Sequence, residues 1–117
     1  MPLFLGIDTS NYTTSVALYD SDNHKDYSAR KLLPVKAGEK GIRQSDAVFH
    51  HTQQLPDLVE EIKKYIDKPI TAVGVSAKPR PVEGSYMPCF TVGLGLARSL
   101  SALLNIPLYE FTHQHGH

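Results

Sequence analysis

The alternation of apolar and polar residues predicts that the chain begins with three β-strands. Leu3 to Asp8 is a short apolar run typical of a buried strand, and Thr13 to Asp20 is rich in β-branched residues. His24 to Leu33 predicts a third strand with a less regular alternation. Because the polar segments Thr9 to Tyr12 and Ser21 to Asn23 are typical of turns, we expect an antiparallel meander.

After the meander the hydrophobic period becomes helical. Pro34 to Gln44 holds a proline, two glycines and four charges, which favour a loop. Ser45 and Asp46 are typical residues of a helix start. The apolar residues that follow at helical spacing are Val48, Leu55, Leu58, Val59, Ile62 and Ile66. Pro56 lies inside this pattern, so we expect the helix to kink or restart there.

The last third of the chain predicts a strand, a loop, a helix and a final strand. Ile70 to Ala77 contains a continuous apolar stretch, as a buried central strand does. Lys78 to Pro88 is rich in proline and predicts a loop. Phe90 to Leu104 has a helical pattern that Asn105 ends, and Ile106 to Phe111 predicts the last strand.

Two glycines, Gly93 and Gly95, lie inside the second predicted helix. Each should cost that helix about 1 kcal/mol relative to alanine. They are explained if the helix lies very close to a sheet or to a bound group. The complete order is β-β-β-α-β-α-β. Because parallel strands need helical crossovers, we expect a mixed five-stranded sheet covered by helices.

Length and composition agree with one α/β domain over residues 1–117, with 41% hydrophobic and 21% charged residues. Twelve basic residues balance twelve acidic ones, so no global field draws the chain to nucleic acid. Cys89 is the only cysteine and cannot form an internal disulfide, which suits a reducing compartment. No apolar run approaches the roughly 20 residues that span a bilayer, so we expect a cytoplasmic protein without a membrane partner.

The turn after the first strand gathers groups that suit a metal–nucleotide complex. These are the Asp8 carboxylate and the hydroxyls of Thr9, Ser10, Thr13 and Thr14. A carboxylate can orient magnesium or its waters, and backbone N–H groups can meet phosphate oxygens. The alternative is a hairpin turn whose hydroxyls satisfy the local backbone.

Three of the last five residues are histidines. On a helical turn His113 and His117 lie four apart and face the same way, so both could reach one zinc or iron ion. Two ligands do not complete a catalytic metal site, which usually takes three from the protein. A solvated chain end is the alternative.

Basic residues gather in the two predicted loops. They are Lys36, Lys40 and Arg43 in the first loop, and Lys78 and Arg80 in the second. If both loops lie at the same end of the sheet, these cations could form a patch for phosphate or the tRNA backbone. Acidic neighbours dilute the patch, and ordinary solvated loops are the alternative.

Four segments resemble, in order, one known family. They are FLGIDTSNYTTSVALYD, LPDLVEEIKKYI, AVGVSAKPRP and VGLGLARSLSALLNIPLYEFTHQHGH. The first resembles the opening hairpin of the actin and sugar-kinase ATPase superfamily, and together they resemble its TsaD/Gcp glycoprotease-like branch. His113, Gly116 and His117 match the H-x-x-G-H signature of that branch. His50 resembles a family histidine near the first helix, while a capping or packing role for His50 and His51 remains open.

The resemblance implies a ribonuclease-H-like, actin-ATPase (ASKHA) lobe, the N-terminal half of a two-lobe protein. Established members add threonylcarbamoyl to a tRNA adenosine. This implies a metal- and nucleotide-dependent carbamoyl transferase, with ATP and magnesium at the Asp8 turn. An acidic residue of a missing C-terminal lobe is implied as a further ligand beside His113 and His117. The 117 residues alone are then expected to be inactive, because their cleft has one wall.

The chain departs from that family at two places. Tyr12 and Thr13 stand where the tRNA-modifying members carry acidic residues, and Lys78 and Arg80 stand where they carry glycines. These departures indicate a divergent paralogue. They leave open a non-catalytic member that serves as a dimerising partner in a homo- or heterodimer. A metallopeptidase (O-sialoglycoprotein endopeptidase) is a third alternative, with little support because the sequence has no His-Glu-x-x-His motif.

Overall fold

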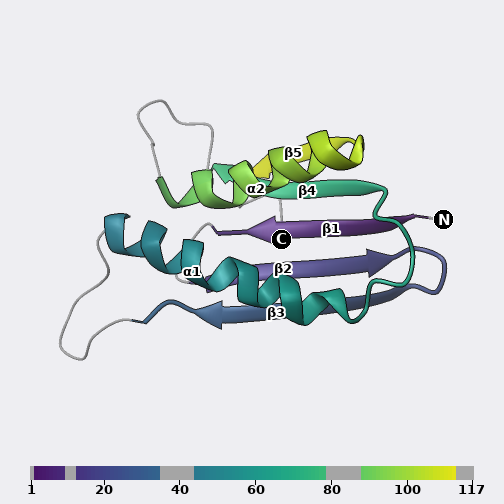
Figure 1. Ribbon diagram of the computed structural model, residues 1–117, viewed down its shortest axis with the longest axis horizontal. Coiled ribbons are helices and arrows are strands. Elements are labelled where there is room, and N and C mark those ends of the chain that lie inside the picture. The colour runs from purple at the N-terminus through teal and green to yellow at the C-terminus, as the bar shows by residue number, and fades with distance from the viewer. Residues whose placement is uncertain (1, 10–12, 35–43, 79–87, 113–117) are drawn as a thin grey trace.

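The computed structural model describes residues 2–9, 13–34, 44–78 and 88–112 (Figure 1). Strands and helices follow one another in the predicted order. The elements are β1 (Leu3–Asp8), β2 (Thr13–Asp20), β3 (Lys25–Leu32), α1 (Gln44–Lys63), β4 (Ala72–Lys78), α2 (Pro88–Leu104) and β5 (Leu108–Thr112). The three strands of the meander begin and end within one residue of their predicted bounds.

The five strands form one mixed sheet in the order β3-β2-β1-β4-β5. Tight connections place β1, β2 and β3 side by side as antiparallel neighbours. β4 lies parallel to β1, and β5 lies parallel to β4, because α1 and α2 carry the chain back between them. The predicted α/β class and mixed five-stranded sheet are confirmed.

Both helices lie on the same face of the sheet, so the fold has two layers (Figure 1). The strands alternate accordingly: Thr14, Val16 and Leu18 of β2 are buried, while the residues between them are half-buried. The main core cluster lies between the sheet and the helices. Its members are Leu3, Leu5, Ile7, Val16, Leu18, Ala29, Leu55, Leu58, Ile62, Val73, Val75 and Ala97.

The second face of the sheet is covered by neither helix (Figure 1). Phe4, Tyr19 and Tyr109 lie on it, with 38%, 41% and 61% of their surface exposed. The rings of Phe4 and Tyr19 stack with centroids 6.3 Å apart.

Helix α1 continues through Pro56, and the predicted restart at this residue is wrong. Pro56 lies on the exposed side of the helix, where water can meet the carbonyl that loses its partner. Leu55 and Leu58 remain in the core on either side of it. In the part of the chain that the structure describes, neither helix is both long and apolar enough to cross a membrane.

Backbone conformation accounts for two of the element boundaries. His24 has a φ of 56°, a left-handed value, so β3 begins at Lys25 instead of His24. Asn105 also has a φ of 56° and directly follows the last residue of α2. Asparagine is one of the residues that tolerate this helix-ending conformation, and the predicted end of the helix is confirmed.

At the end of the sheet where β1 begins, Lys68 ties two connections together. Its Nζ lies 2.8 Å from Asp20 Oδ2 and 3.3 Å from Asp22 Oδ2. The hydrogen bond from Lys68 lowers the pKa of Asp20 below its usual value of 3.8. The same contact raises the pKa of Lys68. This cluster anchors the segment between α1 and β4 to the β2–β3 turn.

Candidate functional site

The carboxyl ends of β1, β3, β4 and β5 meet at one edge of the sheet, and both helices begin there (Figure 1). Helix starts present unpaired N–H groups and a partial positive charge. In open α/β sheets, ligands bind beyond the carboxyl ends of the strands. This edge is therefore the candidate functional site.

Asp8 and Ser76 lie at the ends of neighbouring strands on this edge. Asp8 is half-buried and pairs with Ser15 of β2. Ser76 is fully buried, and its hydroxyl has no hydrogen-bond partner within the described residues. Since buried hydroxyls are normally paired, Ser76 is a further candidate for contact with a bound group. Sequence reasoning missed Ser76. The sequence did contain an indication, because Ser76 is a polar residue near the end of an otherwise apolar strand.

Thr9 joins β1 to the first turn of α2. Its hydroxyl donates to the Cys89 carbonyl at 2.7 Å and accepts from the Gly93 amide at 3.1 Å. The two backbone groups belong to residues four apart, and an α-helix normally joins such a carbonyl and amide by a direct hydrogen bond. Thr9 is fully buried, so its hydroxyl already serves the fold. A nucleotide contact of Thr9 stays a prediction.

The two glycines of α2 have different surroundings. A Cβ on Gly93 would lie 3.0 Å from Thr9 Oγ1 and 3.1 Å from Ile7 Cγ2, so this glycine permits the close approach of helix and sheet. The predicted explanation is confirmed for Gly93. For Gly95 the sheet explanation is wrong, because that residue is exposed and an added Cβ would meet nothing within 4 Å, while the bound-group explanation stays a prediction.

Cys89 is a buried thiol at the start of α2. Burial raises its pKa above the usual value of 9.0, and the negative charge of Asp8 raises it further. Asp8 directly precedes Thr9, whose hydroxyl contacts Cys89 and Gly93, so β1 ends close to the beginning of α2. An anionic ligand at this edge would therefore meet the negative charge that Asp8 already places there.

A buried polar chain links β2, α1 and β3. The Thr14 hydroxyl lies 2.8 Å from His51 Nδ1 and donates to Gln54 Oε1 at 2.9 Å. Gln54 Nε2 in turn donates to the Leu32 carbonyl at 3.2 Å. Because the Thr14 proton is used toward Gln54, His51 Nδ1 must carry the proton that it donates to Thr14. The chain holds the start of α1 against the meander.

His51 thus has the packing role that the sequence left open, and it is fully buried. The sequence allowed this role to be predicted. His51 lies four residues after Ala47 and four before Leu55, so helical spacing puts it on the buried face. His50 points differently. It is half-buried, lies edge-on to Phe49, and borders a hollow of about 600 Å³ between β3 and α1.

Most of the predicted site residues lie outside the described part of the chain. These are Ser10, Lys36, Lys40, Arg43, Arg80, His113 and His117, together with the side chain of Lys78. Thr13 is described and half-buried at the start of β2. Among the described residues, no three His, Cys, Asp or Glu side chains form a metal-holding group. The metal, nucleotide and tRNA contacts therefore stay predictions.

Curated relatives match the chain over nearly its whole length. It is 32% identical over 117 residues to a tRNA N6-adenosine threonylcarbamoyltransferase of Campylobacter fetus, and 33% identical to that of Campylobacter curvus. A probable bifunctional tRNA threonylcarbamoyladenosine biosynthesis protein of Halobacterium salinarum is 27% identical over 113 residues. Each alignment covers 97–98% of this chain. The chain spans 33% of the length of the first two relatives and 20% of the third. No family model matches the sequence.

Solved structures confirm the predicted fold. YeaZ from Pseudomonas aeruginosa superposes with a TM-score of 0.70 at 18% identity, covering 96% of this chain and 44% of YeaZ. Thermus thermophilus RuvC, solved with a Holliday junction substrate, superposes with a TM-score of 0.51 at 11% identity over 97% of this chain. The lobe is of the ribonuclease-H-like, ASKHA type. Over nearly its whole length the chain is thus homologous to a part of proteins named as tRNA N6-adenosine threonylcarbamoyltransferases and tRNA threonylcarbamoyladenosine biosynthesis proteins.

Proposed function

We propose that this chain acts in tRNA threonylcarbamoyladenosine formation, as a lobe that binds the phosphates of a magnesium nucleotide in the cytoplasm. The observation that carries the proposal is the placement of Asp8 at the carboxyl end of β1, one residue before Thr9, whose hydroxyl is hydrogen-bonded to the first turn of α2. The Asp8 carboxylate would orient magnesium or its waters, and the backbone N–H groups of the turn would meet phosphate oxygens. The Ser76 hydroxyl, which has no hydrogen-bond partner among the described residues, supports a ligand at the same edge.

The nucleotide part is tested by titrating ATP with magnesium into the 117-residue chain and following backbone amide signals. We expect saturable shifts at the end of β1 and the start of α2, and at least about a tenfold weakening in Asp8→Asn. Asp26→Asn is the matched control, because Asp26 is an exposed carboxylate on β3, away from this edge. Shifts that are equal in Asp8→Asn and the unaltered chain would contradict the proposal.

The metal part assigns His113 and His117 as two ligands of a zinc or iron(II) ion, with a third supplied by a C-terminal lobe of a longer protein. Calorimetric titration of each ion into the unaltered chain and a His113→Ala/His117→Ala variant tests it. We expect weak saturable heat that the double substitution abolishes. Equal heats in both proteins would remove these histidines from the proposed site.

The tRNA part assigns the phosphate-binding cations to Lys36, Lys40, Arg43, Lys78 and Arg80. Neutralising them should weaken tRNA binding uniformly across sequences, and the salt dependence should flatten by about one unit of slope for each phosphate that is no longer neutralised. Replacing Lys63 and Lys64, near the opposite end of α1, is the control. An unchanged salt slope in the five-residue variant would rule out the patch.

A non-catalytic dimerising partner is the second candidate function. The observation that favours it is the use of the Thr9 and Thr14 hydroxyls in internal hydrogen bonds, which leaves fewer groups for phosphate. The nucleotide titration separates the two candidates. Absence of nucleotide shifts in a folded chain that still binds a related subunit favours the partner role.

A further inference from the structure

We propose that the Thr14 hydroxyl and its two partners on α1 position the candidate nucleotide site without touching the ligand. Together with the Thr9 hydroxyl they hold one end of the β1–β2 hairpin against both helices. We name this group the hairpin clamp. Its members are Thr9 with Cys89 and Gly93, and Thr14 with His51 and Gln54. The inference rests on the proposed function, because it assigns the residues that keep the Asp8 carboxylate in place for magnesium.

The hairpin clamp lies where the β1–β2 ladder ends. Asp8 and Ser15 form the last pair of this ladder, and Thr9 and Thr14 are the next residues along the chain on either side of it. Both threonines are fully buried, and their hydroxyls meet the helices. Because neighbouring side chains of a strand point to opposite faces, the clamp is directly joined to Asp8 and Ser15 but faces the other way.

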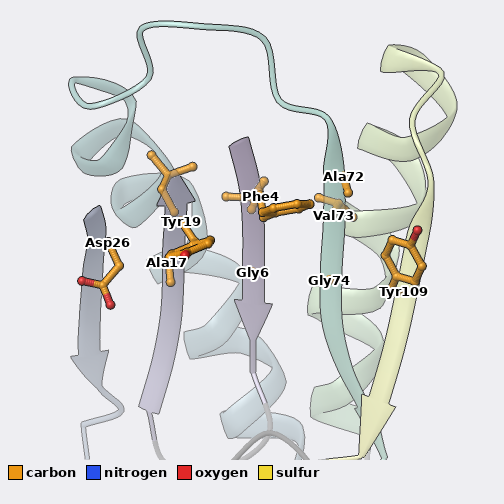
Figure 2. Close-up of a pocket in the computed structure, with 11 residues that line it drawn as sticks. Phe4, Gly6, Ala17, Tyr19, Asp26, Ala72, Val73, Gly74 and Tyr109 are labelled. Atoms are coloured by element: carbon orange, nitrogen blue, oxygen red, sulfur yellow. The ribbon is translucent and has the colours of Figure 1, made fainter. Parts of the chain in front are cut away.

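The Asp8 carboxylate belongs to the face of the sheet that carries neither helix. Figure 2 shows the Phe4 side chain on this face. Asp8 lies four residues further along the same strand, so alternation gives it the same face as Phe4. A ligand held by the Asp8 carboxylate would therefore lie across the strand from the Thr14 hydroxyl. The clamp then acts on that ligand through the backbone of the last ladder pair.

The two anchors of the clamp come from different helices. Thr9 is bonded to backbone groups of α2, whereas Thr14 is bonded to the side chains of His51 and Gln54 on α1. Both anchors restrain the same end of the hairpin. Releasing one therefore lets this end move and reduces what the other contributes, as is usual for neighbouring residues that share a structural element. The clamp should behave as one cooperative unit.

A double-mutant cycle tests this cooperativity without any ligand. Thr9→Val, Thr14→Val and the double variant are unfolded in urea, all in a Gly95→Ala background whose added helix propensity offsets part of the lost stability. The double variant should raise the unfolding equilibrium constant by a factor at least about fivefold smaller than the product of the two single effects. The matching serine variants keep both hydroxyls and should show no such shortfall. Valine effects that simply multiply would overturn the clamp.

Titration of magnesium with ATP, followed by backbone amide signals, tests the positioning role. We expect Thr14→Val to bind at least about fivefold more weakly than the unaltered chain, because losing the groups that orient a metal-binding carboxylate weakens the site. Thr14→Ser keeps the hydroxyl and should restore the affinity. Asp20→Asn is the control for lost stability alone, because it removes the Lys68 ion pair at the opposite end of β2 and leaves the clamp intact.

The outcomes separate this inference from the proposed function. Saturable shifts that Asp8→Asn weakens and Thr14→Val leaves unchanged would overturn the positioning role alone. Equal weakening by Thr14→Val and Asp20→Asn would do the same, because general destabilisation would then explain both. An unaltered chain without saturable shifts would contradict the proposed function, and the positioning role would fall with it.

Discussion

The Thr9 hydroxyl oxygen lies 3.1 Å from the amide nitrogen of Gly93, a residue 84 positions further along the chain. The same hydroxyl donates to the Cys89 carbonyl. The Thr9 side chain thus contacts both backbone groups of the first i-to-i+4 pair of helix α2. The end of β1 and the start of α2 are thereby held in a fixed relation.

Thr9→Val should destabilise the chain by about 1–3 kcal/mol, because it leaves two buried backbone groups without their bridge. Thr9→Ser keeps the hydroxyl and should recover most of this loss. Urea unfolding of both variants measures the difference. Equal stability of Thr9→Val and the unaltered chain would mean that the Gly93 amide finds the Cys89 carbonyl unaided.

The two helix glycines should respond in opposite directions to alanine. Gly95→Ala gains helix propensity in open space and should stabilise by up to about 1 kcal/mol. Gly93→Ala gains the same propensity but drives a methyl group to 3.0 Å from Thr9 Oγ1. We therefore expect Gly93→Ala to lower the midpoint of urea unfolding. Stabilisation by both substitutions is the contrary result.

Thr14→Val is nearly isosteric but removes the hydroxyl that joins His51 to Gln54. The buried polar groups of His51 and Gln54 then each lose a partner. We expect the free energy of unfolding to fall by about 1–3 kcal/mol. Thr13→Val, one position earlier and half-buried, is the matched control and should change little. Thermal or urea unfolding provides the comparison. A small effect of Thr14→Val would show that His51 and Gln54 can pair with each other.

The contact between Asp20 and Lys68 should give a measurable acid dependence. Because the pKa of folded Asp20 lies below 3.8, its contribution is complete above that value and is lost as pH falls through the folded pKa. Asp20→Asn should therefore reduce stability at neutral pH. The deficit should shrink as the pH falls below about 3.8.

Guanidinium unfolding from pH 7 to pH 2 follows this deficit. Asp26→Asn is the control, because exposed Asp26 takes no part in the Lys68 contacts. A deficit for Asp20→Asn that is constant over the whole pH range would contradict the ion-pair explanation.

Local pattern was sufficient to predict the elements and their order. The alternation in β1 and β2 reports which face is buried, so their bounds and pairing followed directly. The same reasoning failed at Pro56, because propensity does not reveal that the proline faces solvent. Gly93 and Gly95 look equivalent in the sequence, and only the packing of α2 on β1 separates them.

Contacts between distant residues explain what sequence reasoning missed at the candidate site. Thr9 was predicted to face a ligand, but its partners lie some 80 residues away in the chain. The Thr14 hydroxyl likewise finds its partners on α1, 37 and 40 positions later. Polar residues in a turn signal that a hydrogen bond is needed, and only the tertiary fold decides what supplies it.

The parallel pairing of β1 with β4 has a consequence for the order of folding. The hydrogen bond from the Leu3 amide to Thr71 Oγ1 closes a loop of 68 residues, whereas the meander needs only short-range closures. Loop-closure entropy therefore favours β1, β2 and β3 as the first structured unit, with β4 and β5 added later. During synthesis the meander can form while β4 is still inside the ribosome. Until the helices arrive, both faces of this nascent sheet remain exposed to water and to chaperones.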